Sequence, residues 1–118
     1  MNAKAVLISV VSACLLACDT GEMSAPDPPP VNPELRAGQA IVDANCLVCH
    51  GQGINGAPII GNRKMWMPRL AQGQDVLVRH AIEGYNYDMM PPRGGNPNLS
   101  DDDIRRAVAY FVSQVAGN

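Results

Sequence analysis

Two cysteines and a histidine lie within five consecutive residues, Cys46-Leu47-Val48-Cys49-His50. Thiols separated by one helical turn point the same way, so both can bond to the two vinyl groups along one edge of a porphyrin. The histidine that follows then presents its imidazole to the iron. This C-x-x-C-H spacing predicts one covalently attached c-type haem, with Cys46 and Cys49 as the attachment sites and His50 as an axial ligand.

Three other kinds of site use part of this pattern. A thioredoxin-like C-x-x-C motif lies between a strand and a helix, a context that this sequence lacks, and it leaves the histidine unexplained. A zinc site needs more ligands, and outside the motif only His80 is available, because Cys14 and Cys18 belong to the N-terminal segment. A Cys46–Cys49 disulfide suits an oxidising compartment but leaves a small domain without an interior. A zinc or disulfide structural module is therefore the alternative to a haem protein.

The N-terminal segment predicts export from the cytoplasm. Residues 5–17 form an apolar run, which is shorter than the ~20 residues that a membrane-spanning helix needs. The run ends in a segment that resembles a bacterial lipobox, with Leu15 three residues and Ala17 one residue before Cys18. We therefore expect residues 1–17 to be a lipoprotein signal peptide and Cys18 to be lipidated. An ordinary cleaved signal and an uncleaved anchor are the alternatives.

Residues 18–32 comprise the expected lipidated cysteine and a proline-rich linker. Such a linker is stiff and extended, because proline restricts the backbone and little in the segment can be buried. Asp19 resembles the inner-membrane retention signal of some bacterial lipoproteins. We therefore expect a monomeric domain at residues 33–118, tethered to the periplasmic side of a bacterial membrane, with the inner membrane favoured over the outer.

Composition limits the fold and the class of partner. The 118 residues include 9 Lys+Arg and 11 Asp+Glu, so the chain has no basic excess with which to bind a nucleic acid. Its aromatic residues are one Trp, one Phe and three Tyr, and no run of alternating β-branched residues predicts strands. We predict an all-α fold, three or more helices wrapped around one covalently attached haem that fills the small interior.

Three segments have the pattern of helices that could position the haem motif. Asn32 can cap the first, predicted at residues 33–47, with a proline at its first position. A shorter helix is predicted at 75–83. The third begins with a capping box at Ser100, carries a regular apolar stripe and ends at Gly117.

Several separate blocks occur in the order found in one known family. They are Gly38, Cys46-x-x-Cys49-His50-Gly51-x-Gly53-x-x-Gly56-Ala57-Pro58, Trp66-x-x-Arg69, the segment from Gly73 to Gly84, Met90-Pro91-Pro92-Arg93-Gly94-Gly95, and Leu99-Ser100-Asp101. Residues 34 to 117 thereby resemble the monohaem class I cytochromes c, and within them the cytochrome c5-like bacterial group. The resemblance implies the small cytochrome c fold. Val42 stands where many members have an aromatic residue, which predicts looser or rearranged packing of the first helix against the last.

Chemistry and resemblance together predict the second axial ligand. A soft thioether on the iron favours the ferrous state and raises the reduction potential. The resemblance places the ligand methionine directly before a proline pair, which makes Met90 the candidate. Pro91 and Pro92 disfavour helix and hold the segment extended. Met89 is the adjacent alternative.

The resemblance also implies residues that support the haem. The Pro58 carbonyl would accept a hydrogen bond from Nδ1 of His50 and leave Nε2 for the iron, as histidine ligands generally require. Trp66 and Arg69 would line the haem and meet its propionates, although a core indole and a solvated charge explain them as well. For His80 we expect a solvent-facing position and no role.

If His50 and Met90 both bind the iron, no coordination position is open to a substrate. The domain is then an electron carrier and no enzyme, and its partners are redox proteins that donate and accept single electrons. The alternative is a haem subunit of an oxidoreductase or a peroxidase-like enzyme, which requires that Met90 can be displaced.

Overall fold

The structure is a computed structural model that describes residues 32–116, and this part of the chain folds into five α-helices. The export segment, Cys18 and most of the linker lie outside the described residues. The helices are α1 (Pro33–Asn45), α2 (Leu47–His50), α3 (Arg63–Leu70), α4 (Gln74–Glu83) and α5 (Asp101–Ala116), with 3-10 turns at Ile54–Gly56 and Pro92–Gly95. Between residues 32 and 116 the only β pairing is an isolated bridge from Tyr85 to Met90.

Local capping explains where the first and last helices begin. The Asn32 side chain accepts a hydrogen bond from the Glu34 amide at 2.9 Å, with Pro33 at the first helical position. At the start of α5, the Asp103 amide donates to Ser100 Oγ at 3.1 Å, while the Asp103 carboxylate accepts from the Ser100 amide at 2.9 Å. This reciprocal pair is a capping box, as the sequence predicted.

The predicted helices differ from the structure at two boundaries, since α4 begins at Gln74 rather than at residue 75, and the predictions lack two helices, α2 and α3. The first helix also ends at Asn45 rather than at residue 47, since Cys46, with φ of −108°, is its C-cap and α2 begins at Leu47. Helix α3 was not predicted. Its sequence contains Pro68 and has no apolar stripe, so it lacks a periodic signal, and the Asn62 side chain caps it by accepting from the Met65 amide at 3.1 Å.

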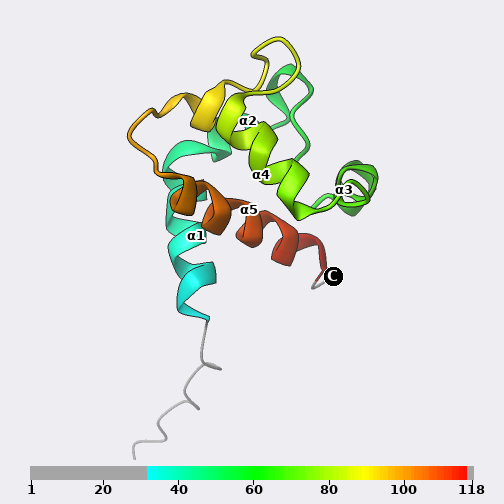
Figure 1. Cartoon of the computed structure of the whole chain (residues 1–118). Coiled ribbons are helices and arrows are strands. Elements are labelled where there is room, and N and C mark those ends of the chain that lie inside the picture. The colour runs from blue at the N-terminus through cyan, green and yellow to red at the C-terminus, as the bar shows by residue number, and fades with distance from the viewer. Residues whose placement is uncertain (1–31, 117–118) are drawn as a thin grey trace, which may run out of the picture.

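Helices α1 and α5 cross in close contact (Figure 1). A Cβ atom on Gly38 would lie only 2.2 Å from the Arg106 carbonyl oxygen, so the crossing requires a residue without a side chain. Val42 is fully buried at this interface. The prediction of looser or rearranged packing at Val42, relative to members with an aromatic residue there, stays a prediction. An ion pair from Arg106 Nε to Glu34 Oε2, at 2.8 Å, also joins them.

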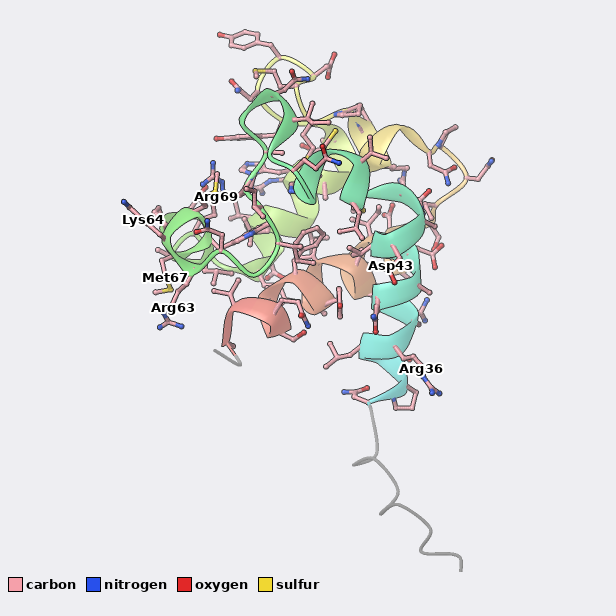
Figure 2. All side chains as sticks on the ribbon, turned by 180° about the vertical axis from the view of Figure 1, so that it is seen from behind. Arg36, Asp43, Arg63, Lys64, Met67 and Arg69 are labelled. Atoms are coloured by element: carbon pink, nitrogen blue, oxygen red, sulfur yellow. The ribbon has the colours of Figure 1, made fainter. Side chains whose placement is uncertain are left out.

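The buried side chains form two clusters. One joins Val42 of α1 to Trp66 of α3 and to the face of α5 that carries Phe111. The other joins Ala81 of α4 to Ile104 and Val108 of α5. Lys64 and Met67 project outward from α3 (Figure 2), whereas Nη1 of Arg63 donates to the Val115 carbonyl of α5 at 3.2 Å. No helix within residues 32–116 is long and apolar enough to span a membrane.

Candidate functional site

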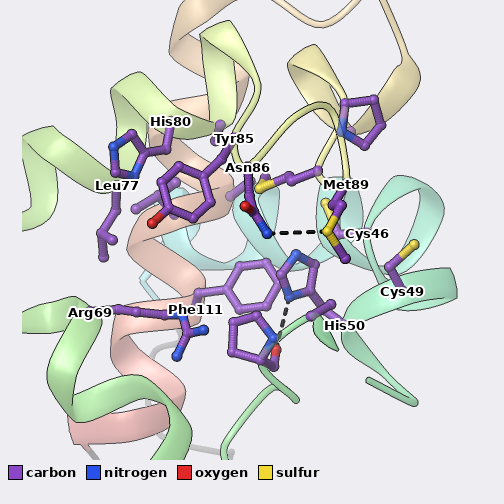
Figure 3. A pocket seen from close by; sticks show the side chains of 18 of the residues that line it. Cys46, Cys49, His50, Arg69, Leu77, His80, Tyr85, Asn86, Met89 and Phe111 are labelled. Carbon is purple, nitrogen blue, oxygen red and sulfur yellow. Dashed lines mark hydrogen bonds between the residues drawn. The ribbon is translucent and has the colours of Figure 1, made fainter. Parts of the chain in front are cut away.

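A cavity opens between the two clusters, and the haem motif forms one of its walls (Figure 3). The other walls come from residues 55–58, from α3 and α4, from the segment 85–94, and from the apolar face of α5. The structure brings all seven site residues predicted within 32–116 to this cavity: Cys46, Cys49, His50, Pro58, Trp66, Arg69 and Met90.

The His50 ring is fixed on several sides. Only 7% of the residue is exposed, and Nδ1 donates a hydrogen bond to the Pro58 carbonyl oxygen at 2.8 Å. The Phe111 ring meets it edge-on at 5.0 Å between centroids, and the Trp66 ring lies at 6.0 Å. Because Nδ1 is occupied by the carbonyl, Nε2 is the nitrogen left for a metal.

Burial also sets the protonation state of this ring. Desolvation lowers the pKa of His50 below its usual value, and the positive charge of Arg69 lowers it further, against the opposing effect of the Pro58 hydrogen bond. The imidazole is therefore neutral near pH 7, and a neutral ring is the form that binds a metal.

Cys46 and Cys49 lie together at one end of the cavity (Figure 3). Both are half-buried free thiols rather than a disulfide. Burial raises the pKa of Cys46 to about 11, with a further contribution from Cys49, so that this thiol is protonated at neutral pH. Because neither sulfur is in a disulfide, both remain available to bond to a ligand in the cavity.

The two candidate methionines differ in their surroundings. Met90 is half-buried and packs against the cluster of Ala81, Ile104 and Val108. Met89 is 46% exposed, and its sulfur accepts a hydrogen bond from the Asn86 amide at 3.1 Å. Both line the cavity, but only Met90 is held by the core.

The backbone around Met90 forms a strap across the cavity. The Tyr85 amide donates to the Met90 carbonyl at 2.9 Å, and the Met90 amide donates back at 3.2 Å. Between them Asn86, Tyr87 and Asp88 adopt left-handed conformations with φ of 54° to 60°, which non-glycine residues rarely adopt.

Trp66 and Arg69 occupy adjacent parts of the wall. Trp66 is 7% exposed, and its indole nitrogen donates to the Ile59 carbonyl at 2.7 Å, which holds the loop 53–60 against the core. Arg69 is partly buried, and its Nη1 donates to the Met65 carbonyl. Its Nη2 makes no hydrogen bond within the described part of the chain and is free to meet an anion.

The expectation that His80 faces solvent is wrong. Its ring lines the cavity and stacks on Tyr85 with 4.3 Å between centroids. Leu77, three residues before it on the same face of α4, also lines the cavity, but spacing alone does not show whether this face meets the cavity or the solvent. Arg93 was quoted only as part of a motif, yet it joins the strap to α5 by donating to the Leu99 carbonyl at 2.7 Å and to Asp101 at 2.6 Å.

The residues of the cavity fit a haem. Its surface is mostly apolar and ends in two free thiols, and a neutral imidazole and a thioether are available as axial ligands. No carboxylate lines it within the described residues, and of its two arginines Arg93 is paired with Asp101 while Arg69 has Nη2 free, which suits the negatively charged propionates of a porphyrin. No three His, Cys, Asp or Glu side chains between residues 32 and 116 gather as a metal site, so the zinc alternative finds no support there.

Comparison with known proteins decides the family. Residues 33–111 match the family described as cytochrome c oxidase, cbb3-type, subunit III. Cytochrome c-555 of Chlorobaculum thiosulfatiphilum is 46% identical over 80 residues, which cover 66% of this chain and 93% of that protein. The chain belongs to the cytochrome c family.

Other relatives agree with this assignment. Cytochrome c5 of Ectopseudomonas mendocina is 39% identical over 75 residues, covering 62% of this chain and 84% of the relative. A solved cytochrome c, from an electron transfer complex with nitrite reductase, superposes with a TM-score of 0.63 at 38% identity, covering 67% of this chain and 94% of that one. The predicted all-α cytochrome fold is thereby confirmed. This cytochrome carries covalent haem c with its iron and transfers electrons; it is a carrier and no enzyme.

Proposed function

We propose that the haem is attached through Cys46 and Cys49 and that its iron is held between Nε2 of His50 and the sulfur of Met90. The supporting observation is that one cavity contains the thiol pair, a buried imidazole with Nδ1 already bonded, and a core-packed methionine on a strap. The haem supplies a single one-electron couple. With both axial positions filled, the protein's part is to exclude substrates from the iron and to hold both ligands during electron transfer.

The attachment sites can be tested on a denaturing gel stained for haem peroxidase activity. Wild type, Cys46→Ala, Cys49→Ala and the double variant are expressed together with the machinery that attaches c-type haem. We expect stain at the position of the wild-type polypeptide and none for the double variant, because only a covalent bond survives denaturation. Stain on the double variant would contradict the assignment.

The axial methionine can be tested with a matched pair of variants. Met90→Leu and Met89→Leu each remove one sulfur while keeping an apolar side chain of similar volume. We expect Met90→Leu to abolish the sulfur-to-iron absorption band of the ferric protein and to lower its midpoint potential. Met89→Leu should leave both unchanged. The opposite pattern would assign the ligand to Met89.

The partners that we propose are redox proteins that exchange single electrons with this cytochrome. The solved relative comes from an electron transfer complex with nitrite reductase, which supports a protein partner of this kind. Side chains beside the cavity offer apolar contact area, since Ile54 is 41% and Met89 46% exposed. Such encounters are brief and bury little area. To test this proposal, the reduced cytochrome is mixed with a candidate reductase and the oxidation of its haem is followed by absorption.

We further propose that the domain at 33–118 is monomeric and tethered to the periplasmic side of the inner membrane through a lipid on Cys18. The support is the sequence of residues 1–17 and of the linker 18–32. Metabolic labelling with a radioactive fatty acid should label wild type and not Cys18→Ser, which should also leave the membrane fraction. A labelled Cys18→Ser variant would contradict the anchor.

A further inference from the structure

We propose that His80 and Tyr85 form, with Arg69, the end of the cavity that receives the haem propionates, and that His80 binds a proton there when the iron is reduced. This inference rests on the proposed function, because attachment at Cys46 and Cys49 determines which edge of the haem faces that end.

The layout of the cavity supports this orientation. In haem, the two vinyl groups and the two propionates lie towards opposite edges of the porphyrin. Cys46 and Cys49 are at one end of the cavity, and Arg69, His80 and Tyr85 are at the other (Figure 3). When the vinyl edge is bonded to the cysteines, the carboxylates must therefore point towards the arginine and the histidine.

The contact between His80 and Tyr85 holds the imidazole at this end. Their rings stack at 4.3 Å between centroids with 29° between the planes. His80 is half-buried and Tyr85 is 49% exposed, so the imidazole is beside both the cavity and the solvent. A proton can reach the ring from water, while a carboxylate in the cavity can accept a hydrogen bond from it.

No side chain within residues 32–116 supplies an anion to His80 inside the cavity. Arg69 of α3, Arg93, which is paired with Asp101, and Tyr85 with the neutral Asn86 line the same cavity. On its own helix, Arg79 and Glu83 are exposed and do not line the cavity. The lining residues of α5 and of segment 55–58 carry no charge. A propionate is therefore the anion that would stabilise a protonated His80.

Electron uptake then favours proton uptake. A redox partner donates one electron, which makes the iron centre more negative by one charge, and the solvent supplies the proton that His80 binds. Because a protonated His80 stabilises the reduced state more than the oxidised state, the midpoint potential is higher at low pH. It falls as the pH rises through the titration of this histidine.

Nuclear magnetic resonance of the haem-loaded protein can test the coupling directly. His50 and His80 are the chain's two histidines, and with His50 bound to iron the resonances of an unligated histidine ring belong to His80. We expect its ring-proton resonances to titrate at a higher pH in the ferrous than in the ferric protein. Equal titration midpoints in the two oxidation states would overturn the proposal.

A matched pair of variants provides the second test. His80→Gln keeps a hydrogen-bond donor that does not titrate, while Arg79→Gln changes the exposed neighbour. Midpoint potentials are measured from about pH 5 to about pH 8, the range in which histidine titrates. We expect the pH dependence of the wild type to persist in Arg79→Gln and to disappear in His80→Gln.

The two proposals can fail separately. A His80→Gln variant that stains for covalent haem and keeps the wild-type pH dependence overturns the role of His80 alone. Covalent haem on the Cys46→Ala/Cys49→Ala variant overturns the attachment on which the orientation rests.

Discussion

The two sides of the haem cavity are built differently. On the His50 side, the proposed ligand is 7% exposed, is hydrogen-bonded to Pro58, and packs against the rings of Phe111 and Trp66 in the core. On the Met90 side, the strap is closed by one pair of backbone hydrogen bonds, and its tip holds three left-handed residues, including the fully exposed Tyr87.

This difference indicates where the site opens first. Regions with few buried contacts and exposed backbone hydrogen bonds open locally at a lower free energy than the core does. The histidine side should therefore hold its geometry until the whole domain unfolds, whereas the methionine side should release its ligand through local opening. Changes to the core should accordingly affect global stability, and changes to the strap should affect ligand exchange.

The largest expected effect comes from removing a core aromatic on the histidine side. Phe111→Ala leaves a cavity between His50 and Trp66, and we expect the free energy of unfolding to fall by ~3–5 kcal/mol. Tyr87→Ala, which removes the exposed aromatic of the strap, should change it by less than ~0.5 kcal/mol. Denaturant titration of the two haem-loaded variants measures both values. Equal losses of unfolding free energy would contradict the predicted difference between the two sides of the cavity.

An intermediate effect is expected where the strap joins α5. Arg93→Gln removes the hydrogen bonds to the Leu99 carbonyl and to Asp101, which we estimate at ~1.5 kcal/mol. The ferric protein should then bind added cyanide about tenfold faster, because cyanide enters only when Met90 is released. Arg105→Gln removes an exposed ion pair with Asp102 away from the strap and serves as the control. An unchanged rate in Arg93→Gln would show that the strap opens elsewhere.

The smallest expected effect is the pH dependence of the capping box of α5. Hydrogen bonds from Ser100 lower the pKa of Asp103 below its ordinary value. The stabilisation is therefore present above the unfolded-state pKa and is lost as the pH falls through the lower folded-state value. Asp103→Asn should lose less stability than wild type on acidification below about pH 4, as thermal unfolding would show. Asp102→Asn should follow the wild type. If the stability of Asp103→Asn falls with pH as steeply as that of the wild type, Asp103 is not the source of this pH dependence.

Sequence reasoning succeeded where the signal is local. The C-x-x-C-H motif, the capping residues Asn32 and Ser100 and the stripe of α5 depend on neighbours within one or two helical turns, so they can be predicted without a fold. Helix α3 could not be predicted in this way, because it contains Pro68 and lacks an apolar stripe. Its position depends on Trp66, which is buried against residues distant in the chain.

The candidate site shows the same difference between features with a local sequence signal and features that depend on distant contacts. The sequence by itself determined the residue types that can bind a haem and the order in which they occur, because motif spacing within a helical turn fixes which side chains point together. Only the tertiary structure decided that His80 lines the cavity and that Met90, rather than Met89, packs against the core. Those outcomes depend on how α4 and the strap pack against α5, and packing between distant segments leaves no periodic trace in the chain.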